Sequence, residues 1–305
     1  MSGNHIQYLT NREVDKRLWD QRIDAAPNGL VYAYSYYLDA LTDNWDALVL
    51  NDYEAVMPLP WRKKYGFSYL YQPAFVAQLG LFGNDISAPL LSAFFQSIPK
   101  KFKYWDFTLN HNNLFALKNY PLFQRSNFVL SLKESYETIY GRYRDNIKRN
   151  IKKAVNYGCF IEKDIDINSI VDLAKQQRQQ SQTAEQDFQN FALLYRQLKA
   201  AFKAMSYGVY SPQNQLLASC VFFFSHNRAY YILVGNHPNG RTLGASHALV
   251  DAFIKEYAGQ NLLLDFEGSD LRNLAFFYSS FGAVEEKYAA IRLNRLPWWA
   301  KWLKE

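Results

Sequence analysis

Residues 229–257 read AYYILVGNHPNGRTLGASHALVDAFIKEY, and this stretch decides the fold. Residues 229–234 form an apolar and aromatic run with the length of a buried strand, and residues 244–257 carry apolar side chains at helical spacing. A polar loop with glycines, a proline and Arg241 lies between them. The pattern predicts a strand, a loop and a helix in succession.

The segments around this pattern recur in the same order in the two halves of the chain. In the second half, the apolar runs predict strands at residues 207–210, 216–224, 229–234, 262–267 and 288–293, and helices at 244–257 and 273–280. In the first half, they predict strands at residues 47–51, 55–59, 67–71, 104–109 and 128–132, and helices at 89–98 and 114–118. Two such series are improbable by chance, so we expect a duplication.

This alternation of strands and helices predicts a mixed α/β (α+β) fold. We expect two tandem domains, each a twisted, mostly antiparallel sheet flanked by helices. The expected domains are residues 1–135 and residues 136–305, and a basic helix opens the second domain.

Length and composition agree with two folded domains. The chain has 305 residues, of which 49% are hydrophobic and 17% aromatic, enough for two cores. The polar stretch MSGNHIQYLTNREVDK lacks the apolar segment of a signal peptide, and no apolar run approaches the roughly 18 residues that cross a bilayer. We therefore expect a cytoplasmic protein without a transmembrane segment, in which Cys159 and Cys220 are reduced thiols.

The formal net charge of +6 is compatible with an anionic partner and also with an ordinary, mildly basic enzyme. A predicted helix at residues 136–157 gathers basic side chains on one side. These are Arg142, Arg144, Lys148, Arg149, Lys152 and Lys153. They form either a solvated face or a surface for an anionic substrate such as tRNA or a phosphorylated lipid.

The loop before residue 244 has the chemistry of a phosphate site. A helix N-terminus presents unpaired N–H groups and partial positive charge, and small residues let a pyrophosphate approach the backbone. The residues expected to hold a donor molecule that carries such a pyrophosphate are Arg241, Leu243, Gly244, Ala245, Ser246 and Asn273. The corresponding stretch 78–89 has bulky apolar residues and Asp85 but no arginine, so the first domain should not bind this donor.

Acid–base chemistry requires titratable groups beside that loop. Asp265 and Glu267 share one face of a predicted strand, because side chains alternate along a strand. Glu267 is nearer the strand end and is the expected general base. A capping or salt-bridge role for Glu267 is the alternative.

Together these residues resemble the FemAB branch of the GNAT (acyl-CoA N-acyltransferase) superfamily. The spacing Arg241-x-x-Gly244-x-Ser246 is similar to the acyl-CoA loop of that superfamily, with serine in place of glycine or alanine. Tyr278, four residues before Gly282, matches a tyrosine that in the family protonates the departing thiolate. The resemblance also covers residues 143–154 with Gly158, and residues 265–269.

The resemblance implies an N-acyltransferase that moves an acyl group from acyl-CoA, with acetyl-CoA expected, to a small-molecule or peptide amine. Tyr278 and Glu267 are its expected catalytic residues. The alternatives are FemAB-type aminoacyl transfer from aminoacyl-tRNA to a cell-wall precursor, and a non-catalytic protein that binds RNA or anionic lipid. FemAB enzymes of peptidoglycan carry a longer chain or a helical arm for tRNA, which is not evident here.

The sequence contains no motif for metal, hydrolase or nucleotide-binding chemistry. The five histidines show no metal-ligand spacing, and neither cysteine belongs to a Cys-x-x-Cys pair, so we expect no metal. The chain also lacks a Gly-x-Ser-x-Gly elbow and a Gly-x-x-x-x-Gly-Lys-Ser/Thr loop.

Overall fold

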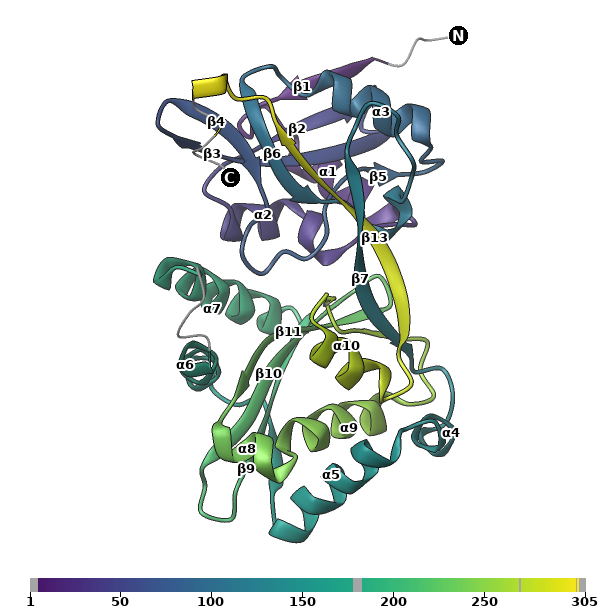
Figure 1. Cartoon of the computed structure of the whole chain (residues 1–305), viewed down its shortest axis with the longest axis vertical. Helices are drawn as coiled ribbons and strands as arrows, with labels where there is room; N and C mark the ends of the chain where they lie inside the picture. Colours follow the sequence, from purple (N-terminus) through teal and green to yellow (C-terminus); the bar gives the residue numbers. More distant parts are fainter. Residues whose placement is uncertain (1–4, 178–182, 269, 300, 302–305) are drawn as a thin grey trace. The chain divides into compact units, whose positions relative to one another are not determined.

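The computed structural model describes residues 5–177, 183–268, 270–299 and 301. The chain divides into two compact units (Figure 1). Unit 1 comprises residues 1–125 and 287–305, and unit 2 comprises residues 126–286. The expected boundary at residues 135 and 136 thus differs from the start of unit 2, and the C-terminal residues that we assigned to the second domain pack with unit 1. Ser269, part of the quoted resemblance, lies outside the described residues.

Unit 1 is a sheet covered by helices. Its elements are β1 (Ile6–Leu9), α1 (Lys16–Ala25), η1 (Val31–Ala33), α2 (Ser35–Leu41), β2 (Trp45–Leu50), β3 (Ala55–Lys64), β4 (Phe67–Tyr71), β5 (Phe82–Gly83), α3 (Ala88–Ser97), β6 (Phe102–Thr108) and η2 (His111–Asn113). The last strand of this sheet is the C-terminal part of β13 (Val284–Asn294), in the order β1-β2-β3-β4-β6-β13, and β5 pairs with β3. Phe95 of α3 packs on Trp105 of β6, with ring centroids 5.9 Å apart.

Unit 2 is a second sheet with helices on both faces. Its elements are β7 (Leu122–Ser131, shared with unit 1), α4 (Tyr136–Gly141), α5 (Asp145–Tyr157), β8 (Phe160–Lys163), α6 (Ile167–Gln177), α7 (Glu185–Ala200), β9 (Ala204–Tyr210), β10 (Leu216–Ser225), β11 (Arg228–Asn236), α8 (Pro238–Leu243), α9 (Ala245–Tyr257), β12 (Leu263–Asp265) and α10 (Arg272–Ser279). Phe222 stacks on Phe253 of α9 at 3.8 Å, and Phe223 stacks on Phe191 of α7 at 5.3 Å. Neighbouring residues of β10 therefore serve opposite faces, as the alternation of a strand requires.

The strands of the two units pair in the same pattern. In unit 1, β2, β3 and β4 are antiparallel, β4 and β6 are parallel, and β6 and β13 are antiparallel. In unit 2, β9, β10 and β11 are antiparallel, β11 and β12 are parallel, and β12 and β7 are antiparallel. In unit 1 the strand after β6 is β13, the last strand of the chain. In unit 2 the strand after β12 is β7, the last strand of the first half. The pattern agrees with the duplication, and the two final strands are exchanged between the repeats.

Three predicted elements differ from the structure. The helix expected at residues 114–118 is absent, because Phe115 and Leu117 both pack against the core of unit 1 with the spacing of extended chain. The helix expected at residues 136–157 is divided into α4 and α5, where the extended Arg144 donates its backbone N–H to the oxygen of Ser280. The loop expected before residue 244 contains the short helix α8.

Candidate functional site

The site begins where two parallel strands of unit 2 diverge. β12 pairs with β11 only from Arg228 to Tyr230, and its last paired residue is Asp265. β11 continues to Asn236 without a further partner from β12 in the described chain. The divergence leaves room beside the second half of β11, where a cavity of about 360 Å³ is found.

A β-bulge lies in this second half of β11. Val221 of β10 opposes Ile232, and Ser219 opposes Gly235, so one residue of β10 faces two residues of β11. Leu233 in the bulge has a φ of 49°, a left-handed conformation that is strained for a leucine. Bulges next to sites redirect the strand, and here the following residue, Val234, lines the cavity.

The cavity brings together four of the residues that the sequence singled out: Arg241, Ser246, Asn273 and Tyr278. They come from α8, α9 and α10. The sequence did not identify the other lining residues, which are Gln177, Tyr231, Val234, Asn236, His247, Leu274 and Phe277. The register and divergence of β11 place Tyr231, Val234 and Asn236, and neither can be read from hydrophobic periodicity.

Arg241 lies in the last turn of α8, and its side chain is exposed. It forms no ion pair with any residue that the structure describes, so its guanidinium is available to an anion. Ser246, in the first turn of α9, donates a hydrogen bond to the side-chain oxygen of Asn236 on β11. This bond links the start of α9 to the end of the diverging strand.

The remaining residues of the expected donor loop do not point into the cavity. Ala245 is fully buried in the core of unit 2, and Leu243 packs against the same core. Gly244 has a φ of +79°, and a Cβ atom there would lie 2.4 Å from the backbone oxygen of Asn150 in α5. The packing of α5 and the left-handed backbone therefore require a glycine at position 244.

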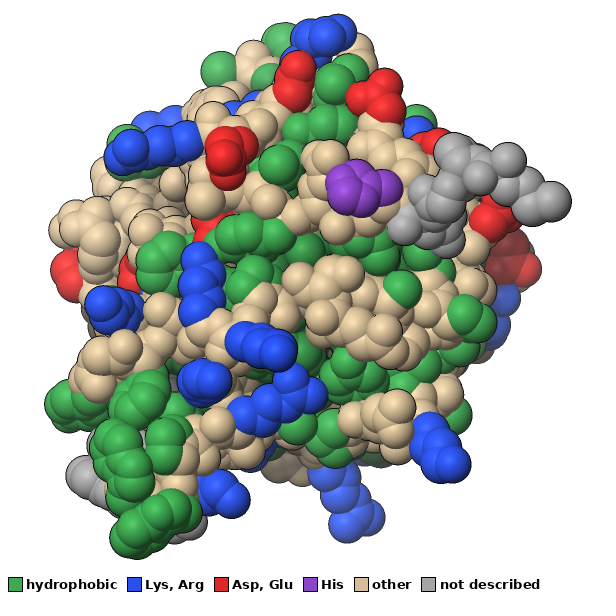
Figure 2. Space-filling model, turned by 90° about the horizontal axis from the view of Figure 1, so that it is seen from above, with side chains coloured by type: hydrophobic (Ala, Val, Ile, Leu, Met, Phe, Trp, Pro, Cys, Tyr) green, Lys and Arg blue, Asp and Glu red, His purple; other side chains and the backbone are tan. Residues whose placement is uncertain are grey.

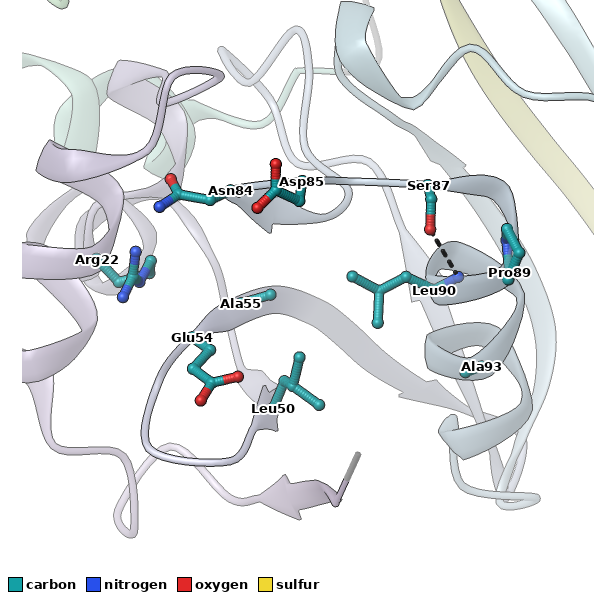
Figure 3. Close-up of a pocket in the computed structure, with 10 residues that line it drawn as sticks. All are labelled: Arg22, Leu50, Glu54, Ala55, Asn84, Asp85, Ser87, Pro89, Leu90 and Ala93. Atoms are coloured by element: carbon teal, nitrogen blue, oxygen red, sulfur yellow. Dashed lines mark hydrogen bonds between the residues drawn. The ribbon is translucent and has the colours of Figure 1, made fainter. Parts of the chain in front are cut away.

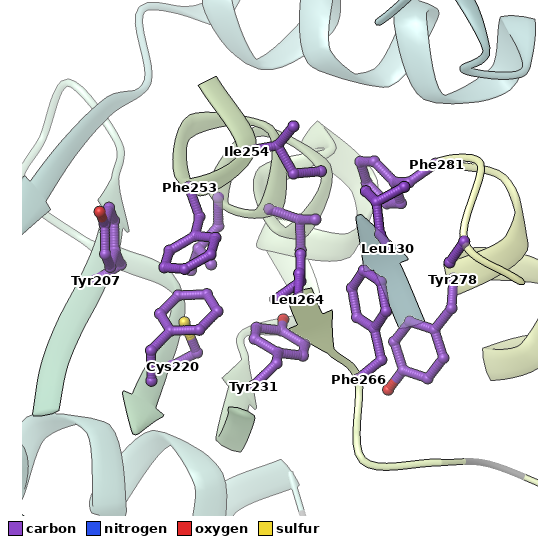
Figure 4. Packing of buried hydrophobic residues seen from close by; sticks show 14 of the residues in the cluster. Leu130, Tyr207, Cys220, Tyr231, Phe253, Ile254, Leu264, Phe266, Tyr278 and Phe281 are labelled. Carbon is purple, nitrogen blue, oxygen red and sulfur yellow. The ribbon is translucent and has the colours of Figure 1, made fainter. Parts of the chain in front are cut away.

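Tyr278 forms part of an aromatic row at the base of the cavity (Figure 4). Its ring stacks on that of Phe266, with centroids 4.5 Å apart. The ring of Tyr231 also contacts Phe266, edge-on, with centroids 5.9 Å apart. Burial raises the pKa of Tyr231 well above its usual value, so its hydroxyl stays protonated. The packing fixes the ring of Tyr278 at the cavity.

His247 is a cavity residue with an unusual environment. Its ring packs edge-on against Phe277, with centroids 5.0 Å apart, and its Nδ1 is buried without a hydrogen-bond partner in the described chain. Burial lowers the pKa of His247 to about 4, so the imidazole is neutral at physiological pH. A neutral imidazole and a tyrosine hydroxyl that line the same cavity have the chemistry of an acid–base pair.

Asp265 has a structural partner. Its carboxylate lies 2.6 Å from the guanidinium of Arg228, which also contacts Glu286 at 2.9 Å. Although burial opposes its charge, these two carboxylates hold the pKa of Arg228 above its usual value. Glu267, the expected general base, has a φ of 60° and donates its backbone N–H to Asp265. Glu267 is half-buried and does not contribute to the described lining of the cavity.

Unit 1 has a larger cavity of about 510 Å³ at the start of α3 (Figure 3). Glu54 and Asp85 place two carboxylates on its wall, and the Arg22 side chain donates to the backbone oxygen of Tyr53. Ser87 accepts a hydrogen bond from the backbone of Leu90 and so caps α3. Two carboxylates beside one guanidinium disfavour a phosphate at this cavity.

The basic residues of α4 and α5 do not form one continuous row. Arg142 forms an ion pair with Glu134, Arg144 lies over the ring of Phe276 at 4.9 Å, and Lys148 lies over Tyr140 at 5.3 Å. The other three, Arg149, Lys152 and Lys153, are exposed and form no ion pair with a described residue. The free basic surface of α5 thus comprises Arg149, Lys152 and Lys153.

Metal-binding clusters and membrane-spanning helices are both absent from the described residues. No cluster of His, Cys, Asp and Glu side chains there has the composition of a metal site. None of the helices there is long and apolar enough to span a membrane.

Residues 141–272 match a family model described as the acetyltransferase (GNAT) domain. This segment includes Arg241 to Ser246 and ends before Asn273 and Tyr278. None of the curated protein sequences is significantly similar to the chain.

Solved structures share the fold over almost the whole chain. The crystal structure of FemX has a TM-score of 0.64 at 12% identity, covering 94% of this chain and 97% of FemX. A conserved protein of unknown function from Bacteroides thetaiotaomicron has a TM-score of 0.58 at 13% identity, covering 95% and 100%. L-PGS from Bacillus licheniformis has a TM-score of 0.53 at 14% identity, covering 85% and 87%. The expected FemAB-like, GNAT-type mixed α/β fold is confirmed, and the family match supports the expected class of N-acyltransferase.

Proposed function

Because the chain carries a GNAT-type acetyltransferase domain at residues 141–272, we propose that unit 2 transfers an acyl group from acyl-CoA to an amine acceptor. We expect acetyl-CoA as the donor, and we expect a protein that uses this donor to lie in the cytoplasm. One observation carries the proposal: the cavity beside the diverging end of β11 gathers Arg241, Ser246, Asn273 and Tyr278.

The cavity fits one end of the donor. Its volume of about 360 Å³ is near the lower limit of small-molecule sites, which span roughly 300–1,000 Å³, so it suits the acyl and thioester end better than a whole CoA molecule. The exposed guanidinium of Arg241 suits the diphosphate, because charge-assisted contacts to phosphate are the strong ones. Asn236, Ser246 and Asn273 add polar groups for the amides of the pantetheine arm.

The chemistry needs one proton acceptor and one proton donor. The neutral amine attacks the carbonyl carbon of the thioester, the C–S bond breaks, and an amide and a thiolate result. In the proposal, the hydroxyl of Tyr278 protonates the thiolate. His247 replaces Glu267 as the group that accepts the amine proton, because His247 lines the cavity and is neutral. A water molecule could connect Glu267 to the site, so both side chains enter the test.

A second candidate donor is aminoacyl-tRNA. The free basic side chains of Arg149, Lys152 and Lys153 on α5 favour it, since phosphate contacts dominate the affinity for nucleic acid. The guanidinium of Arg241 favours acyl-CoA instead, because it has no ion-pair partner among the described residues and lines the cavity that a small donor would enter. A non-catalytic protein that binds RNA or anionic lipid would use the basic side chains of α5 and would not need the cavity residues.

The test is the release of free thiol from acetyl-CoA in the presence of a panel of amines. Tyr278→Phe should lower kcat by about 10²–10⁴-fold with little change in donor affinity, because the hydroxyl acts in the transition state. Tyr257→Phe is the matched control, since Tyr257 packs against the same core and does not line the cavity. Wild-type turnover by Tyr278→Phe would remove the tyrosine from the mechanism.

The same assay separates the two candidate bases. His247→Gln should lower the rate and alter its dependence on pH, whereas Glu267→Gln should leave both unchanged. The reverse result would restore Glu267 as the base. A ligand at a hundred times its dissociation constant adds about 2.7 kcal/mol of stability. The absence of a thermal shift with acetyl-CoA or CoA would therefore favour a non-CoA donor or the non-catalytic alternative.

A further inference from the structure

Unit 1 exposes aromatic and basic side chains at one edge of its sheet. The turn between β3 and β4 presents Tyr65, which is 69% exposed, and the segment after β13 presents Trp298 and Trp299, which are 84% and 56% exposed. The ring of Trp299 lies 5.8 Å from Phe67 at the start of β4, so the turn and the C-terminal segment are neighbours. We call the residues 63–65, 298, 299 and 301 the aromatic–basic edge.

The cations of this edge are free. Lys63, Lys64 and Lys301 are exposed, and none of them forms an ion pair with a described residue. By contrast, Arg62 on the same strand lies 2.5 Å from Asp43, and Arg292 on β13 lies 3.3 Å from Asp106. Figure 2 shows hydrophobic and basic side chains next to each other on this face of the molecule.

The edge is held in place by packing behind it. Leu296 is buried against Tyr104, and Phe67 and Tyr69 pack on that pair. The backbone N–H of Arg295 donates to the oxygen of Lys103 at 2.7 Å. The chain that carries the two tryptophans is therefore anchored to the sheet up to Leu296, although their rings extend toward solvent.

We propose that the aromatic–basic edge docks unit 1 on a membrane surface that contains anionic lipid. Indole rings favour the level of the lipid headgroups, where one part of the ring is apolar and the N–H is hydrated. Unpaired lysines beside them are attracted by the negative surface potential of such a membrane. Tryptophan and lysine together on a protruding turn supply the two signals that reversible membrane binding needs.

The observations favour a membrane over RNA. Proteins stack bases on aromatic rings that lie in a groove or on a sheet face, where one side of each ring is covered. Trp298 and Tyr65 are 84% and 69% exposed, and the side chain of Lys64 lies over the ring of Tyr65 at 5.2 Å, so both rings can reach a headgroup layer. On α5 itself the exposed large hydrophobic side chains are Val155 and Tyr157, and the free basic surface of this helix serves as the comparison.

The experiment is sedimentation of the full chain with vesicles of phosphatidylcholine, with and without phosphatidylglycerol. The wild type should bind the anionic vesicles and release them at high salt. Lys63→Glu/Lys64→Glu should weaken binding by about 25-fold or more, because each cation near the surface contributes about fivefold. Trp298→Ser/Trp299→Ser should weaken binding to a similar extent, and this loss should persist at high salt.

Lys152→Glu/Lys153→Glu on α5 is the matched control, with the same change of charge on an exposed surface of unit 2. It should bind vesicles as the wild type does. Loss of binding in this control with no loss in the edge variants would overturn the proposal. So would failure of the wild type to bind anionic vesicles, or binding to a single-stranded RNA in its place. If the tryptophan variant does not fold, as judged by circular dichroism, the lysine variant carries the test alone.

Discussion

At the scale of single residues, Gly244 has two physical reasons to be glycine. Its φ of +79° is unfavourable for residues with a Cβ atom, and α5 occupies the space where that atom would be. From the sequence we expected a pyrophosphate to approach the backbone here, and that remains a prediction. The packing of α5 against the start of α9 is a second reason for glycine, which the spacing Arg241-x-x-Gly244 does not reveal.

Gly244→Ala should therefore destabilise the protein without any ligand. The left-handed conformation costs about 1–2 kcal/mol, and the overlap with Asn150 adds about 1–3 kcal/mol. Gly259→Ala is the control, because Gly259 has a φ of +83° with open space around its missing side chain, and only the first cost applies. Denaturant unfolding measures both, and equal losses would contradict the packing of Gly244 against α5.

His247 gives a prediction about pH. Its pKa in the folded chain is about 4, against about 6.5 when unfolded, so between these values the unfolded chain binds the extra proton. Stability is then fully present above about pH 6.5 and falls as the pH is lowered. Between about pH 7.5 and pH 5 the wild type should lose about 2 kcal/mol more than His247→Gln. Identical pH dependence of unfolding in the two proteins would show that the imidazole is solvated.

At the scale of elements, the aromatic strand β4 has the predicted bounds, and α9 begins within one residue of its prediction, because each has a clear apolar period. α8 was missed because Pro238, Asn239 and Gly240 are typical of a turn. The structure shows that Pro238 is the first residue of the helix, where its missing N–H costs nothing, and that His237 accepts from the N–H of Asn239. Arg241 thereby gains a fixed position at the mouth of the cavity.

A buried ionic cluster ties β11, β12 and the start of β13 together within unit 2. Arg228→Met would leave Asp265 and Glu286 without their shared cation, and we expect a loss of about 3–5 kcal/mol in the free energy of unfolding at neutral pH. Arg292→Met removes an exposed cation from Asp106 and should cost less than about 1 kcal/mol. A similar small loss for Arg228→Met would mean that the cluster is not needed to join these strands.

At the scale of the whole molecule, the duplication was predictable because each half has its own series of apolar runs. The exchange of β7 and β13 was not, since each strand has a similar run of four buried residues and only their pairing reveals which sheet they complete. The same limit applies to the site. The site residues of α8, α9 and α10 could be singled out in the sequence by the chemistry of their side chains. Tyr231, Asn236 and Gln177 line the same cavity only because β11 and α6 pass beside it.

The central claim is that one donor site exists per chain and lies in the cavity of unit 2. Titration calorimetry with acetyl-CoA tests it most directly. We predict one site per chain, affinity weakened by about 1.5–3 kcal/mol in Arg241→Ala, and unchanged affinity in Lys152→Ala, whose cation is exposed elsewhere in unit 2. Two equivalent sites, or equal affinity in the wild type and Arg241→Ala, would contradict the claim.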